Sequence, residues 1–201
     1  MNRREALQHF LKTYAEDVLN EKLHQAASLY EHSKEELILS FIQSFQSICL
    51  QANSTEVAKT RIGYITYSMR RTYLMDRNYN YVVEAYDKNW FFDPLPYRGI
   101  YDAGWAFGLL AELEDELSQL RKPYMNKVFQ PDVERFVLQA TGEFHQYILK
   151  LAKDAIQQAV HLPEFKAMKC EDDLEVRIGE YKGISEVVYS TAYGVLHDST
   201  G

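Results

Sequence analysis

Cysteine, long apolar runs and catalytic signatures are all scarce in this sequence. Its 201 residues contain only two cysteines, Cys49 and Cys170, which lie far apart and form no CxxC pair. Free thiols in a reducing cytoplasm are therefore expected, rather than a disulfide or a cysteine-bound metal. The longest apolar run, residues 103–111, reaches about half of the roughly 20 residues that cross a bilayer, so no membrane contact is expected.

Basic charge is also in deficit. The formal net charge of −7 argues against recognition of nucleic acid or an anionic membrane through the overall field of this acidic chain. Only residues 59–77 are net basic, and they interleave arginines with tyrosines. Single-strand binders use such a composition. Acidic segments flank this stretch on both sides, however, so nucleic acid is the least favoured partner.

The common motifs for phosphate binding, hydrolysis and metal binding are missing. Residues 99–108 contain glycines but no GK[ST], and neither GxSxG nor HExxH occurs. Glu21 and His24 form an ExxH, which brings a carboxylate and an imidazole onto one helix face, but a di-iron site needs a second such motif. Neither a metal nor another cofactor is expected, and whether the chain catalyses a reaction stays open.

What the sequence does contain is strong helical periodicity. Apolar residues recur at spacings of three and four through most of residues 4–52, which predicts two amphipathic N-terminal helices. Ser33 and Glu36 have the spacing of a capping box at the start of the second helix. Two long helices are predicted within residues 102–162, the second of which begins near Pro131.

Between these helices the period of the pattern changes from 3.6 to two. Residues 62–92 first alternate apolar with polar side chains and then become rich in β-branched and aromatic residues, up to a turn signal before Trp90–Phe92. This pattern predicts an antiparallel β-meander whose third strand is Trp90–Phe92. A helix over residues 57–76 is the competing interpretation. Residues 174–190 predict a C-terminal hairpin that joins the meander.

Together these elements predict an α+β fold. About four helices would form a bundle packed on a small antiparallel β-sheet, and an all-α bundle is the alternative. No repeat or linker divides the chain, so residues 1–201 are expected to form a single domain. The oligomeric state is left open.

Arg71 is the most unusual residue of the predicted sheet. The alternation places it on the inward face together with tyrosines, where a guanidinium needs a carboxylate or a bound anion as its partner. Within the chain, Glu84, Asp87, Asp93 and Asp102 are the candidate carboxylates.

Two classes of function fit these features best. The chain is either a non-catalytic interaction module that binds another protein through an aromatic-rich face, because Tyr, Trp and Arg dominate interface energies, or a binder or enzyme with a pocket around Arg71 for a small anionic ligand. The candidate binding residues are Arg71, Tyr67, Tyr73, Tyr81, Trp90, Tyr101, Asp102 and Trp105.

Overall fold

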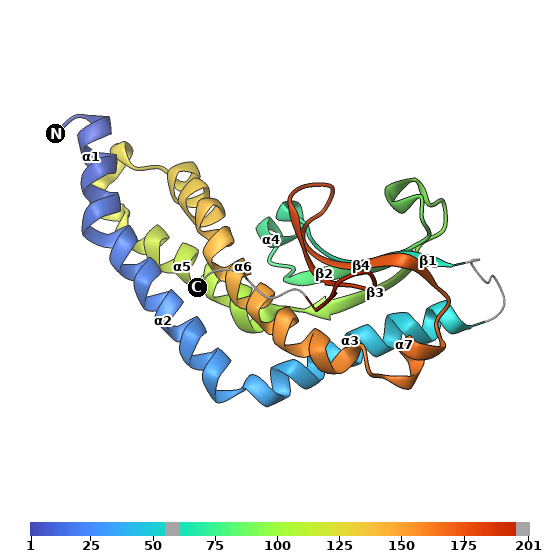
Figure 1. Ribbon diagram of the computed structural model, residues 1–201. Coiled ribbons are helices and arrows are strands. Elements are labelled where there is room, and N and C mark those ends of the chain that lie inside the picture. Colours follow the sequence, from blue (N-terminus) through green and yellow to red (C-terminus); the bar gives the residue numbers. More distant parts are fainter. Residues whose placement is uncertain (55–60, 196–201) are drawn as a thin grey trace. The chain divides into compact units, whose positions relative to one another are not determined.

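The computed structural model describes residues 1–54 and 61–195, and Figure 1 follows its elements along the chain. The chain divides into two compact units, each assembled from two separate stretches of sequence. Unit 1 consists of Met1–His32 and Ala103–Ile148, and unit 2 of Ser33–Asp102 and Leu149–Gly201. The expectation that the whole chain forms one domain stays a prediction. None of the described helices is both long and apolar enough to cross a membrane.

Unit 1 is built from helices, as the periodicity predicts. Its elements are α1 (Arg3–Phe10), the π-helical turn η1 (Leu11–Ala15), α2 (Glu16–His32), α5 (Gly104–Leu120), the 3-10 stretch η4 (Lys122–Lys127) and the first part of α6 (Gln130–Ala159). Helix α2 packs against α5. The buried residues of α2 are spaced four apart and form one stripe, which consists of Val18, Lys22, Ala26 and Tyr30.

The charged member of this stripe, Lys22, is neutralised by α5. Its Nζ lies 3.2 Å from Oε2 of Glu112 and 3.6 Å from Oε2 of Glu116. Burial alone would lower the pKa of Lys22, but the two carboxylates outweigh burial and raise this pKa above its ordinary value. The ion pairs therefore keep the lysine charged within the α2–α5 contact.

Unit 2 contains a mixed sheet, not the antiparallel sheet that the sequence predicts. Its strands are β1 (Ile62–Met69), β2 (Asn80–Tyr86), β3 (Tyr97–Asp102), β4 (Cys170–Glu180), β5 (Ser185–Ser190) and the two-residue β6 (Gly194–Val195), in the order β3-β2-β1-β4-β5-β6. β1 pairs antiparallel with β2 but parallel with β4. A parallel pair needs a long crossover, which the helices between β3 and β4 supply. The predicted C-terminal hairpin is confirmed as β4 and β5.

The meander is confirmed for β1 and β2, but its third strand is wrong. Trp90–Phe92 forms a 3-10 turn, and the third strand is Tyr97–Asp102. Trp90 has a φ of 53°, which no strand accommodates. The carboxylate of Asp93 closes the loop by accepting hydrogen bonds from the backbone N–H of Asp87 at 2.9 Å and of Leu95 at 3.0 Å.

The competing helix over residues 57–76 is wrong in the part that the structure describes. Ile62–Met69 is the strand β1, and only the short helix α4 (Arg71–Met75) follows it. Residues 57–60 lie outside the described part of the chain. The strand therefore ends before Arg71. The expected inward orientation of Arg71 depended on strand alternation, which does not extend to this residue.

The two faces of the sheet are covered differently. Helices α3 (Lys34–Asn53) and α7 (Pro163–Ala167) lie along one face, which we call the inner face, while α4, the β4–β5 turn and the segment after β2 lie on the other, the outer face (Figure 1). Phe41 of α3 stacks on Tyr67 of β1 with ring centroids 4.5 Å apart. The buried strand residues of the inner face include Ile65, Tyr67, Tyr81, Val83, Tyr101, Val176 and Ile178.

A capping box is present, but not where the sequence predicts one. Ser33 precedes α3, yet its side chain makes no capping hydrogen bond, because its backbone is not in the extended conformation typical of this position. The capping box lies instead at the start of α1. The side chain of Asn2 accepts from the N–H of Glu5 at 2.9 Å, and Oε2 of Glu5 accepts from the N–H of Asn2 at 2.8 Å.

Buried tyrosines should make unit 2 sensitive to alkaline pH. Burial raises the pKa of Tyr67, Tyr81 and Tyr86 well above the ordinary value of 10.0. Their folded pKa exceeds the unfolded one, so their contribution to stability is complete below pH 10.0 and is lost as the pH rises towards the folded pKa. We expect the free energy of unfolding to fall above pH 10.0, with part of the phenolate absorbance appearing only when the chain unfolds. Reversible ionisation of all 15 tyrosines without loss of near-ultraviolet circular dichroism would contradict this.

Candidate binding surface on the outer face of the sheet

The predicted aromatic face does not form one surface. Tyr67, Tyr81 and Tyr101 are fully buried on the inner face, where they pack in the core with α3. Trp105 belongs to unit 1, where its ring lies 6.1 Å from that of Tyr30. Of the other candidates, Asp102 is exposed at the end of β3, and Tyr73 and Trp90 are half-buried on elements of the outer side. The odd-numbered positions thus mark the core and leave the surface to other residues.

Arg71 does not point into the core either. It is the first residue of α4, its side chain is 56% exposed, and its Nε and Nη2 lie 3.0 and 2.5 Å from Oε1 of Glu180 at the end of β4. Its partner is therefore none of the four carboxylates that the sequence offered. Those were drawn from nearby residues, whereas Glu180 is brought in by the parallel pairing of β1 with β4, in which Met69 is the partner of Glu180.

An aromatic cluster covers the outer face. Trp90 stacks on Tyr64 of β1 with a centroid distance of 4.4 Å and on Phe91 at 5.0 Å. Phe91 in turn meets Tyr86 edge-on at 5.6 Å and Tyr181 at 6.0 Å. We call these five residues the outer aromatic cluster. They come from β1, the end of β2, the turn after β2 and the β4–β5 turn, so the rings hold both turns against the sheet.

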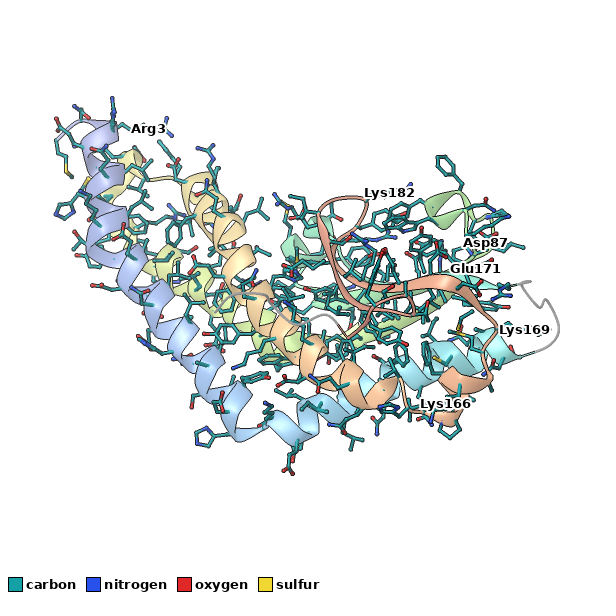
Figure 2. All side chains as sticks on the ribbon, viewed as in Figure 1. Arg3, Asp87, Lys166, Lys169, Glu171 and Lys182 are labelled. Atoms are coloured by element: carbon teal, nitrogen blue, oxygen red, sulfur yellow. The ribbon has the colours of Figure 1, made fainter. Side chains whose placement is uncertain are left out.

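A close backbone approach brings the turn after β2 onto β1. A side chain at Gly63 would place its Cβ only 3.1 Å from Cα of Lys88 and 3.2 Å from the carbonyl oxygen of Asp87. Glycine therefore permits the close contact between strand and turn. Figure 2 shows Asp87 in this turn and Lys182 in the β4–β5 turn, both on the side of the sheet that faces away from α3.

One carboxylate is buried beneath this surface. Glu84 of β2 is 1% exposed, and its two oxygens accept hydrogen bonds from the hydroxyl of Tyr86 at 2.6 Å and from Nε of Arg98 at 3.0 Å. Arg98 stands directly opposite Glu84 in the register of β2 and β3. Burial and the hydrogen bond to Glu84 raise the pKa of Tyr86, which keeps the phenol protonated as a donor.

A second acid of the outer face is also paired with an arginine. Nη1 of Arg177 lies 2.6 Å from Oε2 of Glu175, and the Arg177 guanidinium carbon is 5.2 Å from the centroid of the Trp90 ring. Glu84 and Glu175 therefore each already have a cation.

Two cations beside Tyr181 have no such partner. Among the described residues, Arg70 and Lys182 form no ion pair, and Nε of Arg70 is buried without a hydrogen bond. Both contact the same ring, because the guanidinium carbon of Arg70 lies 4.0 Å, and Nζ of Lys182 5.5 Å, from the centroid of Tyr181. The indole N–H of Trp90 is likewise buried without an acceptor. The outer face thus contains unsatisfied donors and two cations that share one ring.

Exposed apolar side chains surround these groups. Phe92, in the turn after β2, is 91% exposed, and Ile184, in the β4–β5 turn, is 87% exposed. Three further exposed apolar residues lie on α4, β3 and the loop between β2 and β3, and these are Met75, Ile100 and Leu95. Single exposed apolar residues are common, but several on one side of a fold indicate an interaction surface.

Sequence reasoning missed the residues that matter most here. Arg70, Phe91, Tyr181 and Lys182 are not among the candidate binding residues that the sequence offers. The net basic charge of residues 59–77 was a signal for Arg70. No local pattern connects Arg70 with Tyr181, because the two residues meet only through the pairing of β1 with β4.

The described residues offer no group of three or more His, Cys, Asp or Glu side chains that is placed to hold a metal ion. Glu21 and His24 lie in α2, which belongs to unit 1. Comparison of the chain with protein-family models, with curated proteins and with solved structures finds no match. Any functional assignment therefore depends on the chemistry of the residues themselves.

Proposed function

We propose that this chain is a cytoplasmic, non-catalytic binding module that recognises a segment of another protein through the outer face of its sheet. The observation that carries this proposal is the exposure of Phe92 and Ile184 on two separate turns, each of which also contributes a ring to the outer aromatic cluster. Covering a large apolar side chain is worth about 1.5–3 kcal/mol. The two free cysteines, Cys49 and Cys170, fit a reducing compartment.

The turns that bear these side chains are already ordered. Trp90 and Phe91 are stacked on the sheet, and the carboxylate of Asp93 holds the loop by two backbone hydrogen bonds. Ordering a loop at an interface consumes binding energy. A surface whose anchors are fixed in advance avoids this loss, which supports a role in recognition.

The alternative of a small anionic ligand around Arg71 has less support. The guanidinium of Arg71 is bound by Glu180, so its charge is compensated within the chain. A nucleic-acid strand is disfavoured because Glu175 and Asp87 stand on the outer side and would repel successive phosphates.

Selection from a random peptide library on the immobilised full-length chain tests the proposal. We expect enriched peptides to bind in solution and to lose at least tenfold in affinity for the double variant Phe92→Ser/Ile184→Ser, because hot-spot side chains contribute more than about 1 kcal/mol each. The matched control is Leu39→Ser/Leu50→Ser, which removes two exposed leucines from α3 and should leave affinity unchanged. Absence of peptide binding, or equal affinities for both double variants, would refute the proposal.

A further inference from the structure

The two cations beside Tyr181 define what the partner must carry. We infer that the recognised segment contains an aspartate or glutamate whose carboxylate binds Arg70 and Lys182. This inference rests on the proposed function and adds the chemical identity of its polar anchor. Its basis is the arrangement of Arg70 and Lys182 around the ring of Tyr181, since among the described residues neither cation forms an ion pair.

Two tyrosine rings hold the side chain of Arg70 in place before an anion binds. Its guanidinium lies over Tyr181 at 4.0 Å and near Tyr73 at 5.4 Å, measured from the guanidinium carbon to the ring centroids. Its Nε is buried, while its terminal nitrogens are not among the buried atoms without a partner. The planar fork therefore presents its outer edge for two parallel hydrogen bonds to a carboxylate. Contact with the rings restricts the side chain before binding, which lowers the entropy lost on association.

The charges around Tyr181 favour the binding of one anionic group over a chain of anionic groups. Arg70 and Lys182 both lie within 5.5 Å of one ring centroid, so their like charges oppose each other until an anion joins them. Glu84 and Glu175 are engaged with Arg98 and Arg177 and do not relieve this repulsion. They would, however, repel further negative charges. A single carboxylate flanked by apolar residues complements both the cations and the exposed Phe92 and Ile184.

A double-mutant cycle tests the inference with the peptides selected above. Each acidic residue of a peptide is changed to its amide, and each peptide is titrated against the wild-type chain and the Arg70→Gln variant. At one acidic position we expect the amide and Arg70→Gln each to reduce affinity about tenfold, and the two changes together to reduce it no further. Lys182→Gln should give a smaller loss at the same position. Lys88→Gln, which removes an exposed lysine from the turn after β2, is the charge-matched control and should have no effect.

The outcomes separate this inference from the proposed function. If peptides bind through Phe92 and Ile184 but are insensitive to Arg70→Gln, the binding module stands and the carboxylate anchor is refuted. If no peptide binds, both fall. If the chain instead retains a single-stranded RNA oligonucleotide at about 200 mM salt in an Arg70-dependent manner, or if inorganic phosphate alone raises the melting temperature of the wild type but not of Arg70→Gln, the anchor serves another ligand and the inference is wrong.

Discussion

Replacing Phe41 with alanine should lower the free energy of unfolding of unit 2 by about 3–5 kcal/mol, the usual range for a fully buried phenylalanine. Phe41 is completely buried, stacks on Tyr67 at 4.5 Å and meets Tyr101 edge-on at 5.3 Å. It joins α3 to two strands of the sheet. Its removal leaves a cavity between well-ordered elements and abolishes two ring contacts.

Tryptophan fluorescence during urea unfolding measures this effect. Each unit contains one of the two tryptophans of the chain, Trp90 in unit 2 and Trp105 in unit 1. In a Trp105→Phe background, Trp90 alone reports on unit 2. The control Tyr67→Phe keeps the ring and removes only the hydroxyl, which lies 3.0 Å from Oγ of Ser44, so its effect should be close to 1 kcal/mol. If Phe41→Ala is no more destabilising than this control, the packing of α3 on the sheet described here is incorrect.

Replacing Arg98 with alanine should destabilise unit 2 by about 3 kcal/mol, at the lower end of the range for breaking a buried ion pair. The variant leaves the carboxylate of Glu84 buried with only the hydroxyl of Tyr86 to compensate it. Arg98 itself is largely exposed. The loss of stability therefore arises from the buried, unpaired carboxylate of Glu84 and not from the missing arginine side chain.

The control for this prediction is Arg71→Ala, which removes another ion-paired arginine of unit 2. Its partner Glu180 is partly exposed, so water solvates the carboxylate and the expected loss is below about 1 kcal/mol. Adding Glu84→Gln to Arg98→Ala should recover part of the stability, because the amide is neutral and still accepts from Tyr86. Equal losses for Arg98→Ala and Arg71→Ala in chemical unfolding would show that the burial of Glu84 does not govern the effect.

Local pattern determined much of the secondary structure. The spacing of apolar residues located α2, α3, α5 and α6, and period-two alternation located β1, β2, β4 and β5, because both periodicities follow from backbone geometry. Local pattern failed at Trp90–Phe92. Three consecutive aromatic residues resemble a strand, but the positive φ of Trp90 and the hydrogen bonds to Asp93 make this segment a turn that covers the outer face.

The candidate site was decided by contacts between distant parts of the chain. The sequence by itself determined that residues 59–77 are basic and aromatic. It placed Tyr67, Tyr81 and Tyr101 among the candidate binding residues, and only the tertiary structure showed that they are buried in the core. Only the tertiary structure showed the ion pair between Arg71 and Glu180 and the position of Arg70 over the ring of Tyr181. Both contacts depend on the parallel pairing of β1 with β4. Which charges are compensated is therefore settled by strand order and register. These join residues more than a hundred positions apart, and no periodicity in a single segment encodes them.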